Sequence, residues 1–247
     1  MSIEIIAHRG ARFEAPENTL EGFRHALALG MTTVEFDVHI TADGELVVIH
    51  DATVDRTTNG TGKVHELTLA EIRTLDARSI HTLWPEPVRI PTLAEVLETL
   101  RAMPNMEIEI KRDSREHLDR VVRGVIAALR AADRHHGAVM TSFEPYALEL
   151  AMELAPEIPR GLIGDYGNDV MWYLAEKLQV ERVAMGLRTA TPEIVARAKA
   201  AGYRTVGWPC NDEQAVRQVL ECGFDEVCTD APSLFAPMFG KAVNRVS

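Results

Sequence analysis

The sequence predicts a single domain, residues 1–247, with the fold of a (β/α)₈ barrel, and three observations support this. The chain has 247 residues, enough for one barrel-type domain with a large hydrophobic core. Short runs rich in β-branched residues alternate with longer helical runs, as in parallel α/β sheets. Together these runs make eight strand–helix units, the number at which a parallel sheet closes into a barrel.

Strands are expected where short apolar or alternating runs lie between turn residues. The expected strands are Ile3–His8, Thr33–Ile40, Leu46–His50, Asn105–Lys111, Ala138–Phe143, Arg160–Gly164, Arg182–Leu187, Arg204–Pro209 and Glu226–Thr229. The second and third runs flank the loop TADGE and are counted as one unit, which gives eight units in total.

Helices are expected where apolar residues recur at helical spacing. The expected helices lie near Thr19–Leu29, Leu93–Met103, Glu116–Arg134, Tyr146–Leu154, Val170–Gln179, Pro192–Ala201, Glu213–Cys222 and just after Pro232. Leu93, Val96, Leu97 and Leu100, for example, form the stripe of a half-buried helix. An open doubly wound sheet is the alternative fold. It is less favoured because no GxGxxG motif follows the first strand and no Walker lysine loop is present.

One segment, residues 51–90, interrupts the alternation of strands and helices. It holds a run of threonine, asparagine and glycine residues and then a short helical piece near Thr68–Leu75. Connections this long usually carry function or structure of their own. We therefore expect segment 51–90 to be a small insertion at the mouth of the barrel and not a separate domain.

Charge and composition exclude several classes of partner. The formal net charge is −11, from 26 basic and 37 acidic residues, which argues against binding to nucleic acid or to anionic membranes. The three cysteines, Cys210, Cys222 and Cys228, have no metal-ligand spacing and are expected to be reduced thiols. The N-terminus does not resemble a signal peptide, and no apolar stretch could span a membrane. We expect a cytoplasmic protein without a membrane partner, and the sequence leaves a homo-oligomer open.

Acidic residues alternate with apolar ones in two of the expected strands. Glu35 and Asp37 lie on one face of TTVEFDVHI, and Glu109 has the same position near the end of MEIEIK. Since the other face packs against helices, these carboxylates should point into the barrel, where they would repel one another without a cation. Their oxygens suit one divalent cation, Mg²⁺ or Ca²⁺, better than zinc. The alternative is a solvated strand face with chance acids, and Glu107, deeper in the same strand, is more typical of a structural residue.

Two expected strands end in histidine: His8 in IIAHRG and His50 in LVVIHD. A single histidine here would usually be structural, but two beside a carboxylate cluster favour proton transfer near neutral pH. Arg9 can bind phosphate oxygens in a fork, and Lys111 can add a point charge to the same group. Cleavage of a phosphodiester needs these elements: a base, an acid and positive charge.

The order of motifs HRG, PENT, E-F-D-V, T-A-D-G, HD, T-x-G-x-G, E-I-K, T-S-F, W-x-x-N and TD-A-P resembles the glycerophosphodiester phosphodiesterase family of the bacterial, cytosolic type. Each motif is weak alone, but their order from His8 to Pro232 is highly specific. Members of this family are (β/α)₈ TIM barrels that hydrolyse glycerophosphodiesters to sn-glycerol 3-phosphate and an alcohol. The resemblance therefore implies a small-molecule glycerophosphodiester substrate.

The resemblance also implies roles for individual residues. It places the family's paired histidines at His8 and His50, its metal carboxylates at Glu35, Asp37 and Glu109, its phosphate-contacting residues at Arg9 and Lys111, its loop-supporting residues at Glu17 and Asn18, and its mouth aromatics at Phe143 and Trp208. This chain departs from the family at Trp208-Pro209-Cys210-Asn211, where W-T-V-N is common, and at the short tract SIHTLWPEP. Both departures concern the leaving alcohol.

Two other functions stay open at this point. A phospholipase D-like enzyme acting on lysophospholipid or sphingomyelin would need an apolar mouth, for which Leu83, Trp84 and Trp208 are the candidates. A non-catalytic phosphodiester-binding barrel would be expected to lack some of the acid, base or metal residues. The sequence does not assign the acid and base roles to the two histidines. It also does not decide between direct attack by water and a cyclic phosphate intermediate.

Overall fold

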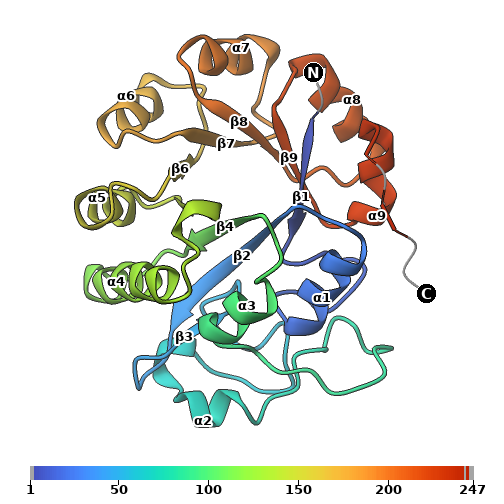
Figure 1. Cartoon of the computed structure of the whole chain (residues 1–247), viewed down its shortest axis with the longest axis vertical. Coiled ribbons are helices and arrows are strands. Elements are labelled where there is room, and N and C mark those ends of the chain that lie inside the picture. Colours follow the sequence, from blue (N-terminus) through green and yellow to red (C-terminus); the bar gives the residue numbers. More distant parts are fainter. Residues whose placement is uncertain (1–2, 242, 245–247) are drawn as a thin grey trace.

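Eight parallel strands form one closed barrel in the computed structural model, which describes residues 3–241 and 243–244 (Figure 1). The barrel strands are β1 (Glu4–His8), β2 (Thr33–Ile40), β4 (Asn105–Ile110), β5 (Ala138–Ser142), β6 (Arg160–Ile163), β7 (Arg182–Gly186), β8 (Arg204–Trp208) and β9 (Glu226–Thr229). Each strand pairs with its neighbours in chain order, and β1 closes the barrel by pairing with both β2 and β9. The predicted fold class is confirmed.

A short ninth strand, β3 (Leu46–Val48), lies outside the barrel ring. It runs antiparallel to the end of β2, with Ile40 opposite Leu46. The TADGE loop therefore connects the two strands of a β-hairpin. The sequence-based count of one unit for these two runs is therefore right. The strand is two residues shorter than expected, because the chain bends after Ile49 and carries His50 back to the barrel mouth.

Helices surround the barrel and follow the strands in alternation (Figure 1). They are α1 (Leu20–Ala28), α2 (Leu69–Ile72), α3 (Leu93–Thr99), α4 (Arg115–Ala131), α5 (Pro145–Leu154), α6 (Asp169–Lys177), α7 (Pro192–Ala200), α8 (Glu213–Cys222) and α9 (Pro232–Phe235), with 3-10 turns η1 (Val64–Glu66), η2 (His135–Gly137) and η3 (Ala236–Phe239). Their ends have local causes. Thr92 and Glu95 form a capping box at the start of α3, and Gly223 ends α8 with a left-handed backbone. None of the described helices is long and apolar enough to cross a membrane.

The main hydrophobic core lies between the strands and the helices. In β2 the outward side chains Val34, Phe36 and Val38 are buried in this layer, where Phe36 meets Phe23 of α1 edge-on. The alternate side chains of β2 consequently face the barrel interior. Packing of the apolar face against α1 therefore fixes the direction of the acidic face.

Segment 51–90 has a small apolar cluster of its own. Val54, Val64 and Ile72 pack there with Val47 and Ile49 of the hairpin end, separately from the main core. The segment contains η1 and α2 and lies along one side of the barrel beside β3 (Figure 1). It therefore has enough packed structure to hold polar side chains in defined positions.

Candidate active site

Three carboxylates from adjacent strands meet inside the barrel. In the register of β2 and β4, Glu35 lies opposite Glu107 and Asp37 opposite Glu109. One oxygen from each of Glu35, Asp37 and Glu109 lies within 4.8 Å of the others, and all three residues are buried. Strand alternation and register are therefore sufficient to assemble the cluster expected from the sequence.

The cluster is electrostatically strained. Burial, followed by repulsion from Asp37 and Glu109, raises the pKa of Glu35 well above its usual value. Burial and the charge of Asp37 likewise raise the pKa of Glu109 to about 7. Burial would also raise the pKa of Asp37, but Lys111 and Arg9 outweigh it and hold that pKa below its usual value. The protein's own cations thus bring the pKa of only one of the three acids, Asp37, below its usual value.

Two basic side chains contact the cluster without saturating it. Lys111 Nζ lies 3.3 Å from Asp37 Oδ1 and 2.6 Å from Glu109 Oε1, and Arg9 Nε lies 3.4 Å from Asp37 Oδ2. Lys111 is shared between the two acids, and the buried Asp37 Oδ1 accepts no hydrogen bond from the described residues. Buried carboxylate oxygens rarely lack partners. The group could hold a metal ion, and an all-oxygen set fits a hard divalent cation.

His8 stands beside the carboxylates, at the end of β1. Its Nδ1 donates a hydrogen bond to Asp230, whose pKa is lowered despite burial by this bond and by the charge of His8, and its Nε2 lies 3.8 Å from Glu35 Oε2. Since a carboxylate only accepts, the proton of neutral His8 is on Nδ1. Burial lowers the pKa of His8, against the opposing effect of Asp230. His8 therefore presents an unprotonated Nε2 near neutral pH.

His50 has a similar arrangement on the other side of the site. Its Nδ1 lies 2.5 Å from Asp51 Oδ1, and burial lowers the pKa of His50, while the charge of Asp37 opposes this. Burial would raise the pKa of Asp51, but hydrogen bonds from Arg56 and His50 bring it down to about 2. Asp51 is thus an ionised carboxylate that accepts a hydrogen bond from Nδ1–H of His50. Nε2 of His50 is left available.

The PENT segment, residues 16–19, holds Asp37 and Arg9 in place by hydrogen bonds. Asn18 Nδ2 donates to Asp37 Oδ2 at 2.8 Å, and Glu17 Oε1 accepts from Arg9 Nη1 at 3.0 Å. Arg56 of segment 51–90 donates to both oxygens of Glu17, at 2.7 and 2.9 Å. Burial would raise the pKa of Glu17, but Arg56 and Arg9 together lower it. Glu17 therefore links segment 51–90 to Arg9.

Three participants in these contacts were not singled out from the sequence: Asp51, Arg56 and Asp230. Asp51 and Asp230 stand in the motifs HD and TD-A-P, so the motifs contained the signal. What was missing was the pairing of Asp230 with His8, which requires β9 to close against β1. For Arg56 the sequence held no comparable signal, because its partner Glu17 is 39 positions away.

A cavity of about 410 Å³ opens over these groups. His8, His50, Glu35, Glu109 and Lys111 line its polar part. Phe143, Ile163, Ala184, Val206 and Trp208 line its apolar part, where the Phe143 and Trp208 rings meet edge-on with centroids 5.8 Å apart. The expected histidines, cations and mouth aromatics, and the acids Glu35 and Glu109, thus line one cavity. Asp37 is fully buried behind this lining, in contact with Lys111, Arg9 and Asn18.

Glu107 precedes Glu109 by two positions on the inward face of β4, and it also lines the cavity. Its Oε1 accepts a hydrogen bond from Arg182 Nη1 at 2.5 Å, and Arg182 also binds Glu226 at 2.9 Å. Glu107 consequently has a guanidinium partner of its own and is not part of the three-carboxylate group, so it serves as a reference residue in the experiments below.

Comparison with known proteins agrees with this geometry. Residues 8–234 match the glycerophosphoryl diester phosphodiesterase family. A glycerophosphodiester phosphodiesterase of Caldanaerobacter subterraneus is 34% identical over 233 residues, which cover 94% of this chain and 96% of that protein. Human glycerophosphodiester phosphodiesterase 1 is 30% identical over 243 residues, covering 85% of this chain and 72% of the human protein.

A solved structure is similar as well. It is an Oleispira antarctica phosphodiesterase in complex with the product sn-glycerol-3-phosphate, with a TM-score of 0.90 and 29% identity, covering 97% of this chain and 98% of that one. Fold, motif order and overall sequence thus agree over nearly the whole chain. The chain belongs to the glycerophosphoryl diester phosphodiesterase family.

Proposed function

We propose that this protein hydrolyses glycerophosphodiesters to sn-glycerol 3-phosphate and an alcohol, using one divalent cation held by Glu35, Asp37 and Glu109. The observation that carries the proposal is the pair of histidines, each with Nδ1 bound to a carboxylate, on either side of three under-neutralised acids. Family membership supports the same reaction. All of these groups line one cavity or lie directly beneath it.

The proposed reaction begins with recognition of the phosphodiester. Lys111, which lines the cavity, supplies positive charge to the phosphate, and Arg9 adds to it from its place between Glu17 and Asp37. When bound, the cation supplies positive charge to the phosphoryl oxygens as negative charge develops on them. Glu35, Asp37 and Glu109 would hold that cation, whose charge would offset their mutual repulsion.

Proton transfer is then assigned to the two histidines. With Nδ1–H bound to Asp230 or Asp51, each ring uses Nε2 toward the substrate, one taking the proton of the nucleophile and the other protonating the leaving oxygen. The carboxylate partners keep each ring in the required tautomer and stabilise its charged form.

The apolar half of the cavity would take the carbon skeleton of the substrate. Phe143 and Trp208 offer ring surfaces to the glycerol or the alcohol, next to the polar half that takes the phosphate. One feature favours a lipid substrate as the second candidate: Leu83 of segment 51–90 is 95% exposed. We prefer the small substrate because Trp208 packs edge-on against Phe143 as part of the cavity wall.

The proposal extends to the metal and the compartment. Mg²⁺ or Ca²⁺ is proposed because the three ligands offer only oxygen. A cytoplasmic location is proposed because the three cysteines are free thiols buried in the fold.

One assay tests the reaction and the metal together. Metal-stripped protein is mixed with glycerophosphocholine, with lysophosphatidylcholine as the parallel substrate, in EDTA or in Mg²⁺ or Ca²⁺, and the phosphorus products are identified by NMR. We expect sn-glycerol 3-phosphate from glycerophosphocholine, only with metal, and restored activity when metal is returned. Glu107→Gln is the matched control, because Glu107 pairs with Arg182 and is not part of the three-carboxylate group, and this variant should keep its metal requirement. Full turnover in EDTA, or cleavage of the lipid alone, would contradict the proposal.

A further inference from the structure

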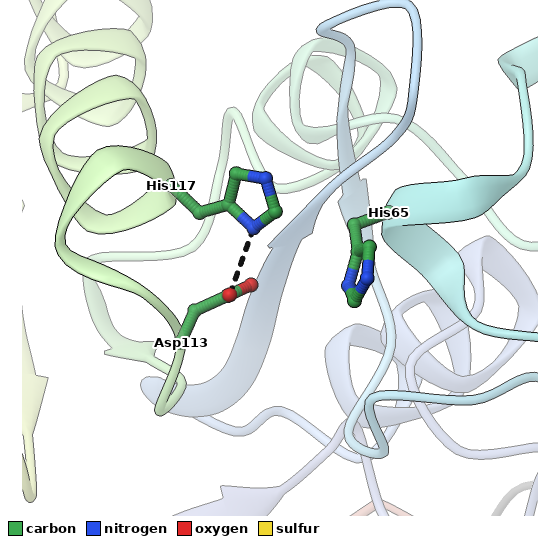
Figure 2. A group of neighbouring side chains, drawn as sticks. All are labelled: His65, Asp113 and His117. Carbon is green, nitrogen blue, oxygen red and sulfur yellow. Dashed lines mark hydrogen bonds and ion pairs between the residues drawn. The ribbon is translucent and has the colours of Figure 1, made fainter.

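A second group of metal-ligand side chains lies away from the carboxylate cluster. His65 comes from η1 in segment 51–90, whereas Asp113 and His117 come from the start of α4 (Figure 2). One ligand atom from each lies within 4.8 Å of the others. The group therefore bridges two parts of the chain that are far apart in sequence.

The local structure holds one half of this group in place. Asp113 Oδ1 accepts a hydrogen bond from Ser114 N at 2.7 Å and contacts His117 Nδ1 at 2.8 Å. The Ser114 hydroxyl in turn caps α4 by accepting from His117 N. Because His117 is on the first turn of a long helix, its ring is directed toward the space beside Asp113 (Figure 2).

The other half, His65, faces it without a hydrogen-bond partner among the described residues. The His65 ring lies with its centroid 5.1 Å from that of His117, at an interplanar angle of 46°. It makes no hydrogen bond to any residue that the structure describes, and its nearest charged neighbour is Glu66 at 3.8 Å. Two adjacent histidine rings repel each other when both are protonated. When both are neutral, they can bind one metal ion together.

We propose that His65, Asp113 and His117 form a binding site for a transition-metal ion of the zinc class. Two imidazoles and one carboxylate suit Zn²⁺, with water in the fourth position, whereas the all-oxygen cluster of Glu35, Asp37 and Glu109 suits a hard cation. The side chains are between 16% and 33% exposed, so an ion can reach them from solvent. The bound ion ties segment 51–90 to the barrel through α4.

This site does not depend on the proposed reaction, so it can be tested without activity. Protein loaded with Mg²⁺ is titrated with Zn²⁺ while the histidine ring signals are followed by NMR. The His65 and His117 signals should shift together at the first added equivalents, and exchange of the backbone amides around η1 should slow. His135 and His136 in η2 are the comparison: their rings are 3.9 Å apart and Asp133 lies 3.8 Å from His135, but the ligand atoms of these three residues are not all close together. Their signals should not move in parallel.

Zn²⁺ affinity measured on variants provides a second test of this site. His65→Ala and His117→Ala should each weaken Zn²⁺ binding at this site by more than the about 10–100-fold that loss of an outer partner costs. The matched control His135→Ala/His136→Ala should retain the wild-type affinity and the wild-type slowing of amide exchange. Zn²⁺ that shifts neither His65 nor His117 in the wild-type protein would overturn the proposal, as would unchanged binding in His65→Ala.

Discussion

Replacing Glu109 with glutamine separates a metal ligand from a merely structural acid. Burial and Asp37 raise the pKa of Glu109 from 4.5 to about 7, so the metal-free fold prefers this group protonated. A raised carboxyl pKa means that stability is lost as the pH rises through the folded-state value. Glutamine cannot ionise, and it keeps the shape and an acceptor oxygen beside Lys111. Metal-free Glu109→Gln should therefore be more stable than the wild type.

The size of the effect follows from the pKa difference. A rise of about 2.5 units at about 1.4 kcal/mol per unit makes ionised Glu109 cost about 3 kcal/mol at pH 8, and only about 1 kcal/mol at pH 5. For a domain of this size, 3 kcal/mol corresponds to roughly 6–12 °C in melting temperature, which is an upper limit for the gain. The advantage of the variant in EDTA should therefore grow as the pH rises.

Metal should reverse the order of the two proteins. Saturating Mg²⁺ or Ca²⁺ stabilises the wild type by mass action, by about 2.7 kcal/mol when the ion is at 100 times its Kd, and the variant should lose most of this gain. Thermal melts at both pH values, with EDTA and with metal, measure all the terms. Glu107→Gln is the control, since it removes a buried acid of the same strand and should keep the full metal-induced shift.

The opposite result has a clear structural meaning. If Glu109 served only to neutralise Lys111, its removal would leave a buried cation unpaired and cost about 3–5 kcal/mol in EDTA. Lys111 also lies 3.3 Å from Asp37, which is why we do not expect this penalty. A variant that melts far below the wild type in EDTA, yet gains the same shift with metal, would refute the assignment of Glu109 to the metal site.

Three further outcomes are expected. His8→Ala and His50→Ala should each lower kcat by about 10²–10⁴-fold with the fold intact, and a p-nitrophenyl ester should rescue only the variant that lacks the acid; near wild-type rates in both would refute these roles. Asp230→Asn should lower kcat strongly with little change in KM, because the His8 tautomer is no longer fixed, and a steady-state assay reports this split. Arg56→Ala should loosen both Glu17 and Asp51 and lower activity, whereas Arg73→Ala, which breaks an exposed ion pair in the same segment, should not.

Much of this molecule follows from patterns within short stretches of sequence. Helical spacing and capping residues predict the helices, and β-branched runs predict the strands, since these depend on near neighbours. The alternation of Glu35 and Asp37 with Val34 and Phe36 is enough to direct the acids inward, because a strand has only two faces. The cluster around the cavity was predictable for the same reason.

The partners of these groups depend on closure of the barrel and on the fold of segment 51–90. Asp230 reaches His8 across 222 positions only because β9 pairs with β1, and Arg56 reaches Glu17 only because segment 51–90 packs on its own apolar cluster. His65 likewise approaches His117 of α4 only because segment 51–90 folds beside that helix. The sequence by itself therefore determined the elements and the facing of their side chains, whereas the tertiary structure decided which charged groups meet. The physical reason is that such pairs form through long-range packing, which no local spacing encodes.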